Sequence, residues 1–452
     1  MGRAVLAVAV VAAVVLVTGM LAQLSTPFIR RDDWPFLVPS DTPGAADPLT
    51  KVRQEGRWLN YAWWLVIGWH ATPAVASVIF FTAYAVFVVG LWRLFALRSR
   101  VTGGLLLAAL LVSPLWVRLS YWPGSLVASA VVTASAVWLL PWASRRRTTL
   151  VGWMVVTTML GVLTYPPVAA LALVAAAIHQ RREPWRELVV VVVGFLAGFA
   201  AGTLVAFTLN AWAFGRFGVE IATWRNPNPV ASPHDLLVNG KRLVRQLVVL
   251  SLTLGPAAAV GVAAGILGLL DERVRPALLR VAAAVVVVAG LECLQTVVTG
   301  VRVNVRGSLW AWLALVVPAG LLLAGSQWSR RAGAAALVAL TVLGVQAWRW
   351  DLGVHQDTRA NYDAIVSAAV ATRGADPGWE VVFHQDPEHR RTARGQITEG
   401  TLRMMFHDQA GIVVRWCRGE ECAQLERLGT QGAVHDLGEV TGVVVPPPPA
   451  VL

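Results

Sequence analysis

The chain has 452 residues, of which 56% are hydrophobic and only 14% are charged. A water-soluble domain carries about 25% charged residues, so this composition excludes an ordinary globular protein. The formal net charge of +12 comes almost entirely from arginine. No basic amphipathic or groove-reading element lies outside the apolar runs, so we expect no nucleic-acid partner.

Long apolar runs recur through residues 1–350 and predict an all-α polytopic membrane domain. The first run, 4–24, ends at Leu21-Ala22-Gln23, a poor cleavage site, so we expect an uncleaved helix rather than a signal peptide. We expect about eleven transmembrane helices, near residues 4–24, 62–92, 103–118, 125–142, 149–164, 168–179, 188–210, 246–269, 281–299, 309–325 and 332–348.

Five arginine clusters in short loops orient these helices. With eleven spans all five lie on one face, the cytoplasmic one by the positive-inside rule. One step remains open, because residues 150–178 form either a short hairpin around Tyr165-Pro166-Pro167 or one kinked span, which would reverse every later helix. The clusters are Arg93, Arg98 and Arg100; Arg145, Arg146 and Arg147; Arg181, Arg182 and Arg186; Arg273, Arg275 and Arg280; and Arg330 and Arg331.

The last hundred residues, 351–452, are polar and predict a small α+β domain on the extracytoplasmic side. We expect a helix over 361–372, strands over 380–383 and 411–416, and a frayed, proline-rich end over 443–450.

The cysteines bear on the location of this domain. Cys417 and Cys422 have four residues between them, including Gly419, and could close a small disulfide loop if that side is oxidising. Two thiols alone do not complete the tetrahedral ligand set of zinc, so we predict no metal there. Such a disulfide favours an outside tail, and therefore the hairpin over the kinked span.

The chemically most informative segment follows the first apolar run, where Asp32 and Asp33 stand beside Arg30 and Arg31. Charge at that depth is costly. Adjacent side chains point apart, so one carboxylate could accept a proton from a hydroxyl while the other orients it, pairs with an arginine or binds a divalent cation such as Mg²⁺ or Mn²⁺. The alternative is a helix end capped by aspartate and paired with the neighbouring arginines.

Cations from two distant segments are candidates for binding phosphate. Arg57 precedes the second apolar run, beside Trp58, which could be an interfacial residue or could stack on a sugar. If the segment around Arg302, Asn304 and Arg306 is extended, its two-residue period places all three on one side. Two arginines there would form a phosphate clamp, and the alternative is a loop of solvated arginines.

Taken together, these segments resemble the GT-C glycosyltransferases, and within them the family typified by phage-type O-antigen glucosyltransferases. The resemblance rests on Asp32-Asp33-Trp34, Glu55-Gly56-Arg57-Trp58-Leu59 and Tyr165-Pro166-Pro167, with a looser match over residues 302–306. It covers roughly the first 180 residues. The family often has glutamine after the tyrosine, where this chain has Pro166.

The resemblance implies transfer of a sugar from a polyprenyl-phosphate donor to a glycan or glycolipid acceptor, with inversion, at the outer membrane face. An acid of the first loop, Asp32 or Asp33, would be the base. The small tail with its cysteine pair is similar to those of actinobacterial envelope enzymes. The donor phosphate would bind Arg57, Arg302 and Arg306, and the substrates would contact Arg31, Glu55, Trp58, Tyr165 and Asn304.

Two other functions compete with this prediction. A transporter or flippase of lipid-linked sugars requires charge in mid-membrane and repeat symmetry, but the apolar runs contain little beyond Glu292 and no clear repeat. A non-enzymatic envelope scaffold with a glycan-binding tail predicts that the aspartate pair is dispensable.

Overall fold

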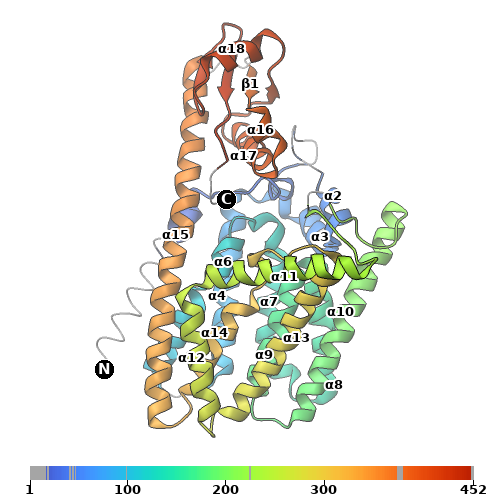
Figure 1. The fold of residues 1–452 in the computed structure, drawn as a ribbon, viewed down its shortest axis with the longest axis vertical. Helices are drawn as coiled ribbons and strands as arrows, with labels where there is room; N and C mark the ends of the chain where they lie inside the picture. The colour runs from blue at the N-terminus through green and yellow to red at the C-terminus, as the bar shows by residue number, and fades with distance from the viewer. Residues whose placement is uncertain are drawn as a thin grey trace.

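The computed structural model describes residues 20–39, 47–97, 99–222, 225–373 and 380–448, together with Val17, Thr42 and Ala45. Most of the predicted first span, 4–24, therefore lies outside the described residues, as do Arg98 and the last residues of the predicted frayed end. The described chain forms a helical bundle with a small mixed domain at one end (Figure 1).

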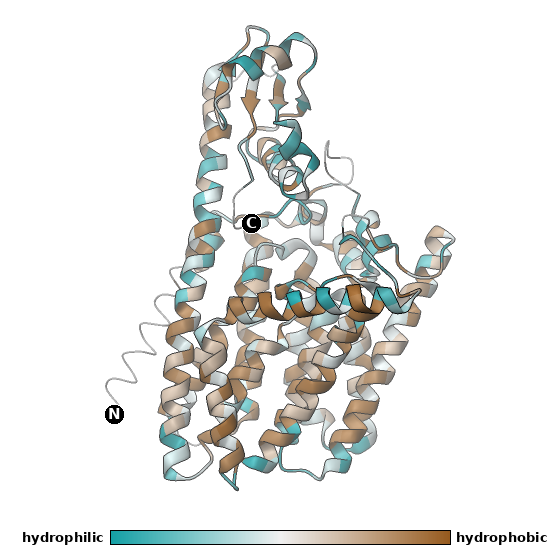
Figure 2. Ribbon diagram, in the orientation of Figure 1, coloured by the Kyte–Doolittle hydropathy of each residue, from teal (hydrophilic) through white to brown (hydrophobic). Residues whose placement is uncertain are grey.

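The described residues include seven helices or helix pairs that are long and apolar enough to cross a membrane. Apolar residues dominate the middle of these helices, whereas polar residues lie toward both ends of the bundle and over the small domain (Figure 2). The helical membrane class is thus confirmed. The predicted count of about eleven spans is not confirmed, because seven helices or helix pairs of the described residues are long and apolar enough to span a membrane. The seven are α4 (Pro73–Leu94), α5 with α6 (Arg100–Leu111 and Pro114–Leu119), α7 (Pro123–Ala143), α8 (Arg147–Thr164), α10 (Trp185–Phe214), α13 (Arg275–Thr299) and α15 (Gln327–Arg373).

The segment that sequence alone left ambiguous, 150–178, is a hairpin. α8 ends at Thr164, and the shorter apolar helix α9 (Pro166–His179) begins with a proline, which has no amide hydrogen to continue α8. The two helices pack on one another. His179, at the end of α9, lies 2.9 Å from the hydroxyl of Ser144, just before α8 begins, so the chain returns to the end from which it started.

Three predicted spans are broken, and residues 103–118 divide between α5 and α6. Residues 62–92 divide into α3 (Trp58–Val66), the short turn η2 (Gly68–His70) and α4. Residues 246–269 divide between α11 (Pro233–Leu254) and α12 (Pro256–Leu270), which bend by 93°. Gly255 and Pro256 interrupt the helix there, because glycine favours helix ends and proline lacks a donor. α11 then lies across the bundle (Figure 1), and its outward side carries exposed apolar residues, as expected of an interfacial helix.

The loops that carry the arginine clusters meet at one end of the bundle. Arg181 donates to the carbonyl of Leu94 at 2.8 Å, and Arg280 donates to the carbonyl of Arg181 at 2.9 Å. Arg147 lies 3.6 Å from Glu187. The loop before α15 joins the α12–α13 loop through a further hydrogen bond. This end is opposite the small domain (Figure 1).

The small domain contains a four-stranded sheet in the order β2-β1-β4-β3. β1 pairs in parallel with β2 and β4, and β3 pairs antiparallel with β4. The prediction of a frayed end over 443–450 is wrong for its first part, since β4 is a central strand in which Val443 and Val444 are buried. The strands are β1 (Glu380–His384), β2 (Val414–Trp416), β3 (Val434–Asp436) and β4 (Val440–Val444), and the helices are α16 (Pro387–Arg391), α17 (Ala393–Ala410) and α18 (Glu420–Leu428).

The small domain is joined to the bundle by a continuous helix. α15 contains both the predicted last span and the predicted helix at 361–372, so the expected boundary at residue 351 falls in the middle of a helix. Its second half packs on β3, β4 and α17. The remaining elements are η1 (Trp34–Phe36), α2 (Pro48–Glu55), the turn η4 (Val305–Gly307) and α14 (Trp310–Leu322).

Candidate functional site

A cavity of about 930 Å³ opens among the loop after residue 30, α2, the start of α7, the α8–α9 turn, α10, α13 and residues 301–307. Segments more than 250 residues apart in the chain therefore line one space. Of the residues singled out from sequence, seven line it: Asp32, Glu55, Arg57, Tyr165, Arg302, Asn304 and Arg306.

Asp32 is the carboxylate that faces this cavity. One oxygen accepts from the ammonium of Lys51 at 2.9 Å, and the other accepts from the indole N–H of Trp122 at 2.6 Å. Its side chain keeps 39% exposure, directed at the cavity. Burial alone would raise the pKa of Asp32, but the charges of Lys51 and Arg306 outweigh it and hold that pKa well below its usual range. Asp32 is therefore ionised at neutral pH.

Asp33 points elsewhere, as expected of adjacent side chains. It is fully buried, and its two oxygens accept from the backbone N–H groups of Gly124 and Ser125, both at 2.7 Å. These are free amides of the first turn of α7, so Asp33 caps a helix far away in sequence. Burial raises the pKa of Asp33 to about 7, against the opposing effect of the hydrogen bonds. Asp33 therefore matches the alternative in which an aspartate caps a helix, whereas Asp32 does not.

The carboxylate of Glu55, the last residue of α2, pairs with two cations of the cavity wall. It lies 3.1 Å from Arg57 and also forms an ion pair with Arg225. These charges and that of Lys51 overcome burial and lower the pKa of Glu55 to about 2. Arg57 in turn stacks on the ring of Tyr165, 4.7 Å from its centroid. Glu55 thus holds two guanidinium groups in the cavity wall.

The loop of residues 301–307 brings the second group of cations. Gly300 ends α13 with φ +68°, where an added side chain would overlap Asn228 and Asn239, so the chain turns sharply into the cavity wall. The segment then runs extended into η4, and Arg302, Asn304 and Arg306 all face the cavity. Arg306 lies over the ring of Trp122 at 3.6 Å, on the same indole that donates to Asp32.

Part of the cavity wall, which we call its apolar end, is formed by apolar residues of two helices. They include Phe195, Phe199 and Phe207 of α10 and Leu294 and Val298 of α13. Leu294 and Val298 are about half exposed, at 55% and 49%. Because exposed apolar surface of a membrane bundle faces lipid, the apolar end is continuous with the surface that a bilayer would cover.

Two of the predicted substrate contacts lie away from this cavity. The indole N–H of Trp58 donates to Asn210 at 2.9 Å, and the ring packs near Phe214. Arg31 donates to the backbone carbonyl of Gln396 in the small domain at 2.6 Å. Neither is among the described residues that line the cavity.

Several cavity residues were missed from sequence, namely Lys51, Trp122, Arg225 and Gln246, and Glu292 was noted only as a charge within an apolar run. One signal was available, because Lys51 is one of only two lysines in the chain and stands one helical turn before Glu55. Gln246 and Glu292 support the cationic loop, since Gln246 accepts from the N–H of Val303 at 2.8 Å and donates to Glu292 at 3.0 Å.

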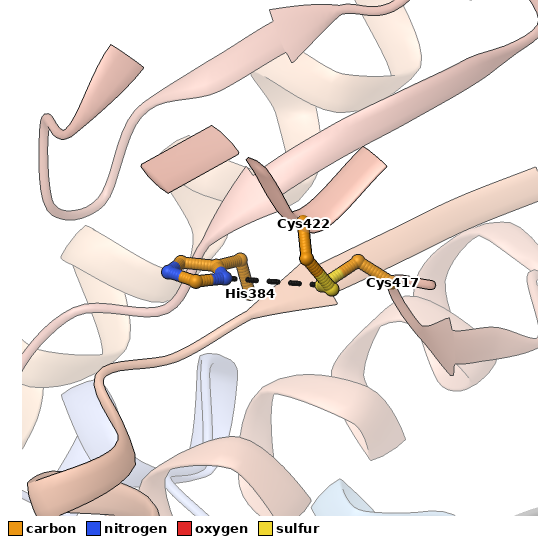
Figure 3. A group of neighbouring side chains, drawn as sticks. All are labelled: His384, Cys417 and Cys422. Atoms are coloured by element: carbon orange, nitrogen blue, oxygen red, sulfur yellow. Dashed lines mark hydrogen bonds between the residues drawn. A yellow bond between two sulfur atoms is a disulfide. The ribbon is translucent and has the colours of Figure 1, made fainter. Parts of the chain in front are cut away.

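A divalent cation does not fit the aspartate pair. Lys51 and Trp122 occupy the oxygens of Asp32, and backbone amides occupy those of Asp33, so the two carboxylates share no open site. In the described part of the chain, one group of at least three residues has metal-binding spacing: His384, Cys417 and Cys422. Figure 3 shows that the two cysteines are joined in a disulfide beside His384. Their sulfurs are therefore not available as thiolates.

Comparisons with protein-family models, with curated proteins and with solved structures found no match to this chain. The class of protein that the fold defines is a helical membrane protein with a small α+β domain at one end.

Proposed function

We propose that this chain is a membrane glycosyltransferase that uses a polyprenyl-phosphate sugar as donor and a glycan or glycolipid of the cell envelope as acceptor. The observation that supports this proposal most is the composition of one cavity. A carboxylate, a set of cations and an apolar end open to lipid occur together there. These are the groups that a hydroxyl nucleophile, a phosphate leaving group and a prenyl chain require.

In the proposed reaction, an acceptor hydroxyl gives its proton to Asp32 as its oxygen attacks the anomeric carbon. The bond between that carbon and the phosphate oxygen breaks, and the configuration inverts. The leaving polyprenyl phosphate gains negative charge, which Arg57, Arg302 and Arg306 stabilise as charge-assisted donors. Asp33 contributes by fixing the loop to α7, and Trp122 orients Asp32.

The apolar end suits the lipid part of this donor. Moving a polyprenyl chain from the bilayer into water costs free energy. The protein must therefore bind its phosphate while the chain stays in an apolar environment. Entry between α10 and α13 keeps the chain against phenylalanines and aliphatic side chains while the phosphate reaches the cations.

The proposed orientation places the cavity on the extracytoplasmic side. The arginine-rich loops gather at the opposite end of the bundle, which the positive-inside rule assigns to the cytoplasm. The disulfide in the small domain is consistent with an oxidising compartment.

The direct test uses purified protein in lipid nanodiscs with a panel of polyprenyl-phosphate sugars and a lipid-linked oligosaccharide acceptor. Transfer by the wild-type chain and its loss in Asp32→Asn support the proposal. Full transfer by Asp32→Asn would remove the proposed base. Movement of the lipid-linked sugar across proteoliposomes without transfer would instead identify a flippase.

A further inference from the structure

The segment that leads to Asp32 is attached to parts of the chain beyond residue 350. Arg359 of α15 donates to the carbonyl of Pro27 at 3.0 Å. Arg30 lies 3.3 Å from the ring nitrogen Nε2 of His355, also on α15. Arg31 donates to the carbonyl of Gln396 on α17 at 2.6 Å. Three successive contacts thus tie residues 27–31 to the helices that carry the small domain.

The contact of Arg31 with α17 depends on a glycine. Gly400 lies inside α17, where alanine would ordinarily be the more stable residue. A Cβ at position 400 would overlap Cδ and Nε of Arg31 and would lie 2.7 Å from its Cγ. The stem of Arg31 therefore occupies the space that a side chain at residue 400 would need, and its guanidinium reaches Gln396 one turn earlier.

Asp32 stands between two fixed points. On one side, Arg31 is held by α17 of the small domain. On the other, Asp33 is held by the first turn of α7. Because Asp33 is fixed, a shift of the backbone at Arg31 would fall on Asp32 and would change the direction of that carboxylate.

We infer that the small domain positions Asp32 through the contact of Arg31 with Gly400, so that the position of α17 controls the reactivity of the cavity. Arg31 and Gly400 are positioning residues in this scheme, since neither lines the described cavity. The inference rests on the proposed function only for its effect on catalysis. Its structural part, the coupling of α17 to residues 27–33, is testable without any substrate.

The first experiment measures hydrogen exchange in the purified full-length chain in nanodiscs. Gly400→Ala displaces Arg31, so peptides covering residues 23–38 should exchange about tenfold faster, while peptides in α4 and α10 remain unchanged. Gly353→Ala on α15 is the matched control, because an added Cβ there meets nothing within 4 Å. Unchanged exchange of residues 23–38 in Gly400→Ala would overturn the inference.

The second experiment uses a compensating change. Arg31→Ala removes the side chain that a Cβ at residue 400 would overlap. The double variant should therefore show the hydrogen exchange of Arg31→Ala alone, and not the sum of the two single effects. If the wild type transfers sugar, Gly400→Ala should lower kcat about 100-fold, with binding of unglycosylated polyprenyl phosphate unchanged within about twofold. Additive effects in the double variant, or an equal loss of phosphate binding, would contradict a positioning role.

These readouts separate the two proposals. Altered exchange at residues 23–38 in a wild-type background that transfers no sugar would leave the coupling intact and remove the transferase. Transfer that is normal in both the wild type and Gly400→Ala would leave the transferase intact and remove the control of its reactivity by α17.

Discussion

Different interactions stabilise the charged end and the apolar end of the cavity. At the charged end, each group has a specific partner, such as Asp32 with Lys51 and Trp122, or Glu55 with Arg57. At the apolar end, α10 and α13 present side chains whose contacts are weak singly and large only in sum. A single change should therefore have large effects at the charged end and graded effects at the apolar end.

The sharpest way to test this difference is to compare the two adjacent aspartates. Asp32→Asn removes the proposed base and should lower kcat by about 1,000-fold, with the thermal midpoint unchanged. Asp33→Asn instead turns an amide N–H toward the donors of Gly124 and Ser125, and should destabilise the fold by about 1–2 kcal/mol. Transfer assays normalised to folded protein, together with thermal unfolding, measure both. An equal loss of kcat in the two variants would contradict the distinction.

The cations should show the next largest effect. Arg306→Ala removes one charge-assisted phosphate donor and should weaken polyprenyl-phosphate binding about 30-fold, because the charge of Asp32 then also loses a compensating cation. Arg306→Lys should recover only part of this, since lysine lacks the planar fork. Binding is measured by titration in nanodiscs. Arg273→Ala, at the opposite end of the bundle, is the control that should bind normally.

The apolar end should respond according to chain length. Phe199→Ala removes lining surface and should weaken binding of a long-chain polyprenyl phosphate about tenfold, yet leave a short-chain analogue almost unaffected. Val193→Ala on the lipid-facing side of α10 should change neither. Equal losses for long and short chains would indicate that the prenyl chain does not occupy this end of the cavity.

The smallest effect at neutral pH is expected for Lys51→Met. Lys51 and Arg306 lower the pKa of Asp32, so removing Lys51 raises that pKa toward its ordinary value. Asp32 must be ionised to accept a proton, and the acidic limb of the kcat/KM profile should therefore move to higher pH by about one unit. The alkaline limb should stay in place. A pH–rate profile with an unmoved acidic limb would show that Asp32 does not govern it.

Sequence alone located the charged end of the cavity better than the apolar end. Charge is rare in an apolar chain and costly near a bilayer, so Asp32, Arg57, Arg302 and Arg306 stood out, and all four line one cavity. The lining residues of α10 were not predicted, because phenylalanine and valine are common in every span and nothing in their spacing distinguishes a cavity from lipid contact.

The helical membrane class and the strands β1 and β2 were also predictable, since hydropathy and residue type depend on the local sequence. Other features depend on which distant segments meet. Folding alone pairs Asp32 with Lys51 and Trp122, makes Asp33 a cap for α7, seats Arg31 on Gly400 and places β4 in the middle of a sheet. Except for the pairing of Asp32 with Lys51, 19 residues apart, these are contacts across long stretches of chain, and a residue's type and near neighbours do not specify its partner there.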